Sequence, residues 1–350
     1  MEIKNLRCIE GLNTSPARGI NALVGRNGAG KTTFLEAMSL VGFGRSFSPA
    51  QTRDVVREGT QSARVNATIE YEEQKSLEIR VEKSVEGTKI TINGAVARSA
   101  SELVQRVPII LLNSKVPDIL ISTPHSRRVL LDRVLFHVEP SYVQLWRNYR
   151  LALGQRNSVI RGAKDRRLVR FWTEQLAQNG EKIDARRREV VDSLNESLND
   201  SILGAEIGVL RLKYLSGWQG VSFEEELERG WTRDLELGYT RVGAHRADIR
   251  LILGQRDVIQ RLSRGQLKVV SSEIVLGLGN FIRRKKSVWP VIMVDDIQAE
   301  LDDRMRSLVV DKILLAGGQK FFTAISSSSI PEIFKKADVV FHVEQRNSSS

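Results

Sequence analysis

Alternating apolar and polar residues near the start of the chain predict strands, a glycine-rich turn and a helix. Residues Glu2–Ile9 alternate, and Ile20–Val24 is a short apolar run that ends at a glycine. Because successive strand residues face opposite sides, both segments are expected to be strands. Apolar residues at helical spacing then predict a helix over Thr32–Val41.

Strand-like alternation resumes between Ala63 and Ile92. Turn signals at Glu86-Gly87 and Asn93-Gly94 divide this stretch, which predicts an antiparallel β meander. The run Val107–Leu112 is expected to be a buried strand. This longest apolar run is far shorter than the roughly 20 residues of a membrane helix, so no membrane partner is expected.

The middle of the chain predicts long helices. Helical spacing favours one helix at Arg127–Phe136 and two longer ones, Tyr142–Leu153 and Leu168–Leu198. The basic turn Arg161–Arg167 separates the last two, so we expect antiparallel helices that form an arm of roughly 30–40 Å. An ordinary helical bundle would show the same apolar stripe.

Strands return after Gly208 and alternate with helices to the end. This alternation predicts a parallel sheet of the α/β class. The polar stretch Arg346–Ser350 is expected to be disordered. The expected elements are strands at Val209–Leu215, Ala247–Leu253, Val291–Val294, Lys320–Ile325 and Val339–Glu344, and helices after Gln266 and at Glu300–Leu315.

The glycine-rich turn is a candidate phosphate site. Its sequence fits G-x-x-x-x-G-K-[ST] between a strand and a helix, a context that a chance glycine turn would lack. Glycines let backbone N–H groups point at phosphate oxygens, Lys31 should reach the β- and γ-phosphates, and Thr32 should bind Mg²⁺. The residues expected to bind ATP here are Gly25, Arg26, Asn27, Gly28, Ala29, Gly30, Lys31, Thr32 and Thr33.

Two carboxylates end the strand Val291–Val294. Asp295 is expected to bind Mg²⁺ together with Thr32, and Asp296 to polarise the attacking water. Asp295, Asp296 and Lys31 form the expected catalytic set. Asp296 is one methylene shorter than the glutamate that many such proteins carry, which favours slow hydrolysis. A strand followed by an acidic turn is the structural alternative.

The segment Leu262–Gln266 opens a helix, with Ser263 placed to cap it. It resembles the signature of ABC ATPases, L-S-x-G-Q. The resemblance implies that Ser263, Gly265 and Gln266 contact ATP bound by a second copy, so that ATP joins a homodimer. Glu300-Leu301-Asp302 resembles the D-loop that crosses the same interface. Taken alone, such a helix start is usually only a cap.

Charge and cysteine content bear on partners and compartment. Lys and Arg number 53 against 42 Asp and Glu, a net charge of +11 that suits a polyanion such as nucleic acid. A protein that is simply basic would show the same balance. Cys8 is the single cysteine, and a reducing cytoplasm is expected. The candidate DNA-contacting clusters, with solvated helix faces as the alternative, are Arg161, Lys164, Arg166, Arg167 and Arg170, then Arg186–Arg188, then Arg283–Lys286.

Along nearly its whole length the chain resembles the RecF family, bacterial recombination mediators in the SMC-type branch of the ABC ATPases. Besides the nucleotide motifs, the segments that carry the resemblance are Gly42–Phe47, Pro124–Asp132, Gln155–Asn157, Gly243–Asp248 and Ser263–Lys268. The implied fold is an ABC-type ATPase head with an antiparallel β meander and an inserted helical arm. The implied division is head 1–115, arm 116–207 and head 208–350.

The resemblance also implies a function. ATP and Mg²⁺ would be the cofactors of a weak ATPase, and ATP would drive a dimer that binds single-stranded and gapped DNA. With RecO and RecR it would help load RecA, supporting replication restart and the SOS response. The alternative is the ATPase subunit of an ABC transporter, which would co-purify with a membrane complex and bind no DNA.

The chain also departs from the family pattern. Ser114-Lys115-Val116 stands where a Pro-Glu segment would sense the γ-phosphate, and Ala244 replaces a proline. Thr323–Ser326 stands where transporters carry a switch histidine. These departures leave the sensing step open and favour ATP acting mainly as a clamp. Whether Gly243–Asp248 contacts the nucleotide or is structural is also open.

Overall fold

The structure is a computed structural model that describes residues 1–47, 52–71, 75–162, 166–220, 222–298 and 301–343. The chain forms two compact units, Met1–Val116 with Ile282–Ser350, and Pro117–Phe281. None of the helices within the described residues combines the length and apolar character that crossing a bilayer requires.

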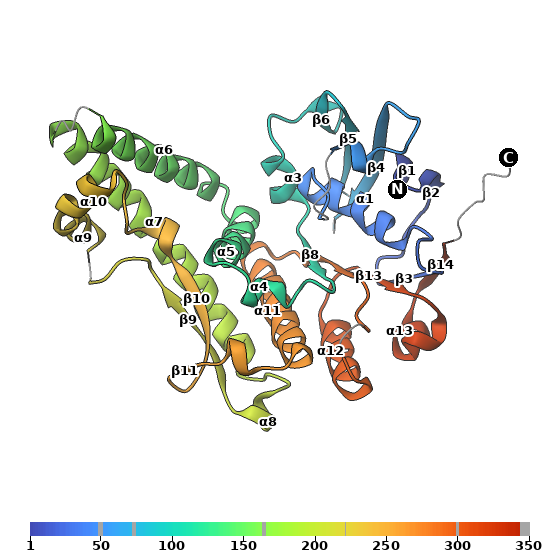
Figure 1. Cartoon of the computed structure of the whole chain (residues 1–350). Coiled ribbons are helices and arrows are strands. Elements are labelled where there is room, and N and C mark those ends of the chain that lie inside the picture. Colours follow the sequence, from blue (N-terminus) through green and yellow to red (C-terminus); the bar gives the residue numbers. More distant parts are fainter. Residues whose placement is uncertain (48–51, 72–74, 163–165, 221, 299–300, 344–350) are drawn as a thin grey trace. The chain divides into compact units, whose positions relative to one another are not determined.

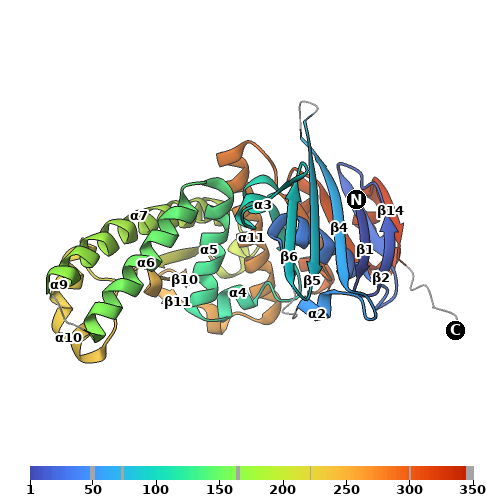
Figure 2. The ribbon, with the colours of Figure 1, turned by 90° about the horizontal axis from the view of Figure 1, so that it is seen from above.

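The first unit contains a six-stranded antiparallel sheet in the order β2-β1-β4-β5-β6-β7 (Figure 2). The expected β meander is confirmed. The expected single strand Glu2–Ile9 is wrong: the backbone turns at Arg7, where φ is 47°, and the chain folds back as a hairpin. The strands are β1 (Glu2–Leu6), β2 (Ile9–Asn13), β4 (Ser62–Glu70), β5 (Ser76–Ser84), β6 (Gly87–Ile92) and β7 (Ala95–Val96).

A second sheet of the first unit is parallel throughout, in the order β14-β3-β13-β12-β8. This confirms the expected parallel sheet for the strands at Val291–Val294, Lys320–Ile325 and Val339–Glu344. The prediction is wrong for Val209–Leu215 and Ala247–Leu253, which pair antiparallel with each other in a separate sheet. The strands of the parallel sheet come from both ends of the sequence and are β3 (Ile20–Val24), β8 (Ile109–Leu112), β12 (Val291–Val294), β13 (Lys320–Ala324) and β14 (Val339–His342).

Helix α1 (Lys31–Phe43) contacts both sheets. Its Phe34 and Leu35 join one hydrophobic core with Val65 of the antiparallel sheet and Phe321 of the parallel sheet. The core therefore fixes the helix that begins at the phosphate loop. The other helices of this unit are α2 (Thr52–Val55), α3 (Ser101–Arg106), α12 (Asp303–Leu315) and α13 (Pro331–Lys336).

Helix α12 begins three residues later than the sequence predicts. The Asp302 side chain accepts a hydrogen bond from Met305 N at 2.8 Å and caps the helix there. Asp and Asn are favoured caps because they satisfy a free backbone N–H of the first turn. Glu300, the first residue of the expected D-loop, lies outside the described residues.

The second unit is built on a pair of long helices, α6 (Tyr142–Arg161) and α7 (Arg166–Leu198), which pack against each other (Figure 1). At 1.5 Å per residue, α6 spans about 30 Å and α7 about 50 Å, so α7 is longer than expected. A three-stranded antiparallel sheet, β11-β10-β9, belongs to the same unit.

The remaining helices of the second unit are α4 (Asp118–Ile121), α5 (Pro124–Val138), α8 (Gly204–Ile207), α9 (Phe223–Arg229), α10 (Trp231–Leu237) and α11 (Arg264–Lys286), whose last residues belong to the first unit. Its strands are β9 (Leu210–Leu215), β10 (Asp248–Leu253) and β11 (Arg256–Asp257). Residues 208–281 thus belong to the same compact unit as the helical pair. The division into head, arm and head follows the motifs, and it stays a prediction about function.

Candidate nucleotide site

The phosphate loop connects β3 to α1, the strand–loop–helix context expected from the sequence. Gly28 and Gly30 have φ of 79° and 110°, a left-handed backbone that favours glycine. At Gly25 a Cβ atom would lie 2.2 Å from the Val343 carbonyl oxygen. The geometry therefore requires glycine at all three of these positions in the loop.

Lys31 lies back over this loop. Its Nζ donates hydrogen bonds to the carbonyl oxygens of Gly25 at 2.7 Å and Arg26 at 3.0 Å. Burial lowers the pKa of the Lys31 ammonium, and the carboxylates of Asp295 and Asp296 oppose that shift. The structure thus brings the loop lysine and the acidic pair into one electrostatic environment.

Asp295 is held by two threonine hydroxyls. Thr323 Oγ1 donates to Asp295 Oδ1 at 2.7 Å, and Thr32 Oγ1 donates to Oδ2 at 3.2 Å. Burial raises the pKa of the Asp295 carboxyl, while these hydrogen bonds and Lys31 act in the opposite direction. The two residues that the sequence predicts as Mg²⁺ ligands, Thr32 and Asp295, are therefore neighbours.

Thr323 is a positioning residue whose contact with the acidic pair the sequence did not predict, although its segment stands where transporters carry a switch histidine. It lies in β13, whose five residues are all buried, and its hydroxyl also accepts a hydrogen bond from Asp296 N at 3.1 Å. One side chain therefore orients both members of the acidic pair. The signal was a hydroxyl in an otherwise apolar buried stretch, on a strand that pairs in parallel with β12.

The oxygens of Thr32 and Asp295 fit a Mg²⁺ ion. Mg²⁺ usually keeps several waters and takes one or two protein oxygens together with substrate phosphates. In the described part of the chain no cluster of three or more acidic, histidine or cysteine side chains could hold a metal by itself. The pair therefore suits an ion that arrives with a nucleotide.

Asp296 is exposed and has φ of 52°, a conformation that Asp tolerates better than most residues. Its expected role toward water stays a prediction. The segment Ser114–Val116 follows β8, whose last carbonyl, Leu112 O, accepts a hydrogen bond from Asp295 N at 2.7 Å. The segment where a γ-phosphate sensor is expected therefore follows directly after the strand beside the acidic pair.

The signature segment caps α11 in the second unit. Gln266 N donates to Ser263 Oγ at 3.2 Å, and Ser263 N donates to Gln266 Oε1 at 3.0 Å. This reciprocal pair is a capping box, so the predicted cap is confirmed. Ser263 is exposed, whereas Gly265 and Gln266 are half-buried. Their contact with ATP stays a prediction.

Segments outside the nucleotide motifs that carry the family resemblance form ion pairs inside the second unit. Arg127 binds Asp248 through two hydrogen bonds of 2.6 and 2.9 Å. Arg187 binds Asp132 in the same two-pronged way at 2.8 and 2.9 Å, with both side chains buried. Gly243–Asp248 therefore has a structural role here.

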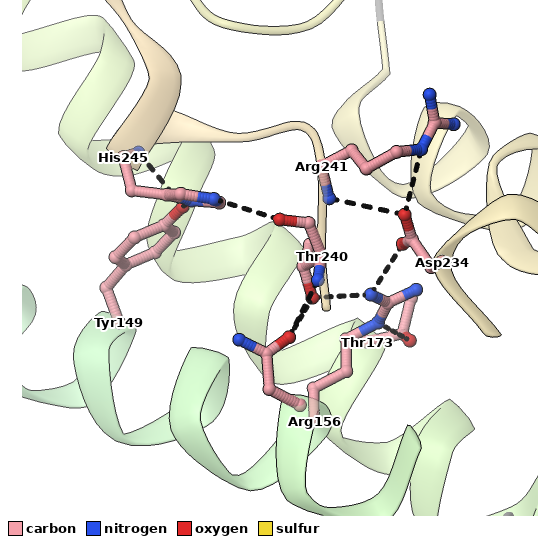
Figure 3. Close-up of polar contacts among 8 residues, drawn as sticks. Tyr149, Arg156, Thr173, Asp234, Thr240, Arg241 and His245 are labelled. Carbon is pink, nitrogen blue, oxygen red and sulfur yellow. Dashed lines mark hydrogen bonds and ion pairs between the residues drawn. The ribbon is translucent and has the colours of Figure 1, made fainter. Parts of the chain in front are cut away.

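Figure 3 shows the polar contacts of Arg156, the central residue of the Gln155–Asn157 segment. Arg156 is fully buried and donates to Asp234 at 2.8 Å, Thr240 at 2.6 Å and Thr173 at 3.0 Å. Asn157 Oδ1 accepts from both the backbone N–H and the hydroxyl of Thr240. These bonds fasten α6 to α7 and to the segment after α10.

His245 extends the same network. Its Nδ1 lies 2.8 Å from the Tyr149 hydroxyl, and its Nε2 lies 3.2 Å from the Thr240 carbonyl oxygen (Figure 3). Burial lowers the pKa of His245 to about 4. The ring is therefore neutral at pH 7 and serves as a hydrogen-bonded link.

The basic run Arg186–Arg188 does not form an open positive surface. Arg187 is buried against Asp132, and Arg186 pairs with Glu139 at 2.8 Å. Arg188 pairs with Asp184 and lies 5.2 Å from the Tyr214 ring centre. Arg187 is therefore unavailable to DNA from its buried position, whereas DNA contact by Arg186 and Arg188, whose side chains are 48% and 51% exposed, stays a prediction. Lys164 lies outside the described residues.

Comparison with known proteins places this arrangement in a family. The RecF/RecN/SMC N terminal domain family matches residues 1–350. A DNA replication and repair protein RecF of Shewanella baltica (strain OS223) is 32% identical over 350 residues, covering 99% of this chain and 97% of the relative. The chain belongs to the RecF family. A Shewanella pealeana RecF, at 31% identity with the same coverage, agrees.

Solved structures confirm the RecF fold. A structure described as the recombination mediator protein RecF with ATP in the RecFOR pathway has a TM-score of 0.82 and 24% identity, covering 93% of this chain and 91% of its own. An Smc head domain from Pyrococcus furiosus has a TM-score of 0.57 and 16% identity over 99% of this chain and 93% of its own. The expected ABC-type head with an inserted helical arm is confirmed at the level of fold.

Proposed function

We propose that this RecF-family chain is an ATP-dependent DNA-binding protein of recombinational gap repair. The observation that carries the proposal is the Thr32–Asp295 pair beside a complete phosphate loop. It occurs in a chain that matches DNA replication and repair proteins over 99% of its length. A phosphate loop with two adjoining oxygen ligands, in a chain of this family, supports the proposal that nucleotide controls the protein.

Within this proposal the first unit binds ATP. The backbone N–H groups of the loop and the start of α1 favour phosphate oxygens, because the N-terminal end of a helix carries partial positive charge. Lys31 leaves its carbonyl partners for the β- and γ-phosphates. Thr32 and Asp295 hold Mg²⁺, which neutralises phosphate charge when bound. Asp296 orients the water that attacks the γ-phosphate.

ATP also joins two copies in the proposal. Ser263 lies at the exposed start of α11, a 23-residue helix whose N-terminal end favours an anion. Ser263, Gly265 and Gln266 of one copy contact the γ-phosphate bound by the other. The homodimer that results is the DNA-binding form, and slow hydrolysis resets it.

The partners follow from the family. Its solved members are described as recombination mediators of the RecFOR pathway, which supports RecO and RecR as partners of this chain. Single-stranded and gapped DNA are the proposed substrates, and RecA loading is the outcome that serves replication restart and the SOS response. The cytoplasm, where these components meet, is the proposed compartment.

Gapped-DNA binding with and without ATP tests the function. Binding by the full chain, followed from 50 to 200 mM salt, should tighten with ATP and weaken steeply with salt, because phosphate contacts release counterions. Equal affinity with and without ATP would refute the ATP-gated mechanism. Absence of DNA binding together with co-purification of a membrane complex would instead support a transporter subunit.

A further inference from the structure

Helix α6 has one face that internal packing holds and one that it leaves exposed. Its buried residues, among them Tyr149, Ala152, Arg156 and Ile160, recur at helical spacing. The opposite face is exposed along the helix. We define the outer face of α6 as Arg147, Leu151, Gly154, Gln155, Ser158 and Arg161.

The outer face is positive and rich in hydrogen-bond donors. The 20 residues of α6 include no Asp or Glu and four arginines. Arg147 and Arg161 form no ion pair with any described residue, whereas Arg156 is buried and Arg150 lies 4.9 Å from the Trp146 ring centre. Guanidinium, amide and hydroxyl groups are the side chains that contact DNA phosphates.

Carboxylates on the elements packed against α6 do not cancel this charge. Glu174 of α7 pairs with Arg170, and Glu236 of α10 pairs with Arg233. Asp132 of α5 and Asp234 of α10 are buried and bound to Arg187 and Arg156. The arginines of the outer face are therefore available to an external anion.

Gly154 is the residue that internal packing does not explain. It lies in the interior of α6, where glycine weakens a helix relative to alanine, yet a Cβ atom there would meet nothing within 4 Å. Two glycines inside other long helices of this unit differ from Gly154: a Cβ at Gly180 would lie 2.6 Å from the Phe223 ring, and one at Gly277 would lie 2.9 Å from Leu194. Gly154 suits the close approach of an outside molecule.

Leu151 also supports contact between this face and an outside molecule. It is 56% exposed, one turn from Gly154 in the middle of the donor-rich face. A single apolar side chain flanked by arginines matches a DNA strand, which presents apolar sugar edges between charged phosphates. A partner helix from a second copy would be expected to bring acidic side chains or a longer apolar stripe.

We propose that the outer face of α6 binds the sugar-phosphate backbone of DNA. The proposal rests on the proposed DNA-binding function and names the surface that performs it. The Arg156 network fixes the inner side of the helix, so the outer face is rigid before DNA arrives. Arg147 and Arg161 contact phosphates, and Gly154 lets the strand approach the helix backbone.

Paired substitutions test the surface. Arg147→Ala with Arg161→Ala should reduce the slope of log K against log salt concentration by about two and weaken gapped-DNA binding on the order of tenfold at physiological salt. The matched control is Arg229→Ala with Arg233→Ala, which removes the same charge from exposed residues on α9 and α10. Equal effects of the two pairs would overturn the proposal.

The substitution Gly154→Gln is a second, independent test of the surface. Glutamine favours a helix, so thermal stability should hold or rise, while the longer side chain should weaken DNA binding several-fold with the salt slope unchanged. Unchanged affinity would overturn the close approach. Loss of self-association measured without DNA would assign the face to a second copy. Wild-type protein that binds no DNA would refute the proposed function itself, a result separate from these.

Discussion

The phosphate loop and the Arg156 network are both marked by charged residues in family-like segments, yet they use those charges differently. At the loop, Lys31 and Thr32 make hydrogen bonds that a ligand can replace. In the second unit, Arg156 and Asp234 are fully buried and satisfy each other. The motif alone therefore does not tell a ligand-binding residue from a structural one. Burial and intramolecular pairing do.

The largest expected effect comes from breaking the buried pair. Asp234→Asn should destabilise the second unit by about 3–5 kcal/mol, because it leaves the Arg156 guanidinium buried without a counter-charge. Chemical denaturation followed by fluorescence measures the loss. Arg233→Gln on the same helix is the control, since its exposed pair with Glu236 contributes less than about 1 kcal/mol. Similar decreases in the free energy of unfolding for both variants would contradict the difference between the buried and the exposed ion pair.

Lowering the pH should reduce the free energy of unfolding of the second unit. The pKa of His245 falls from 6.5 to about 4 on burial, so the folded chain resists protonating this ring. Stability from the neutral ring is complete above pH 6.5 and decreases by about 3 kcal/mol as the pH falls through 4. His245→Asn should flatten this part of the unfolding profile, and an unchanged profile would exclude His245 as its cause.

Asp295 should respond to pH with the opposite sign. Its pKa is raised by burial, so the folded first unit holds this proton more tightly than the unfolded chain does. Its contribution to stability is therefore present at low pH and lost as the pH rises through the raised value. Asp295→Asn should remove this pH-dependent contribution to stability and also weaken magnesium-dependent ATP binding.

Lys31→Arg tests the ligand-binding side of the comparison. The bulkier guanidinium cannot fit the same loop, so ATP affinity should decrease about 100-fold, equivalent to about 2.7 kcal/mol. Fluorescent-nucleotide titration and sedimentation would follow binding and dimerisation. The unfolding free energy should change little, because arginine keeps the positive charge near the acidic pair and the Lys31 hydrogen bonds are to loop carbonyls. A dimer that persists with ATP would contradict nucleotide-mediated joining.

The smallest expected effect is that of Ser263→Ala. Losing the capping hydroxyl should cost about 1 kcal/mol of helix stability. ATP affinity of the isolated copy should stay near wild type, while the ATP-dependent dimer weakens. Ser263→Asn, which retains a cap, controls for helix fraying. Equal loss of monomer binding and dimerisation would argue against a contact made across two copies.

The sequence predicted the elements with local signals and missed those that depend on tertiary contacts. The phosphate loop, the strand before Asp295 and the α11 cap follow local rules, and all three were found. The hairpin at Arg7 was missed because alternation continues through the turn. The contact of Thr323 with the acidic pair was missed because it comes from the pairing of two strands that are distant in sequence.

Arginine content was equally ambiguous in the sequence. Arg161 and Arg187 both lie in basic segments, but one is exposed and the other is buried against Asp132. They are distinguished only by which side of each helix faces the core. The partners that would reveal this, such as Asp132 and Asp234, lie far away in the chain. The outer face of α6 could be recognised only once its inner side was known.

Ser263, which caps helix α11, lies in the same compact unit as α6. Under the proposals above, one folded body then carries both the group that senses ATP and the surface that holds DNA. Thermodynamic linkage makes such an arrangement reciprocal: whatever factor ATP adds to DNA affinity, DNA must add to ATP affinity. A gap in DNA would then act as an effector of nucleotide retention as well as a substrate.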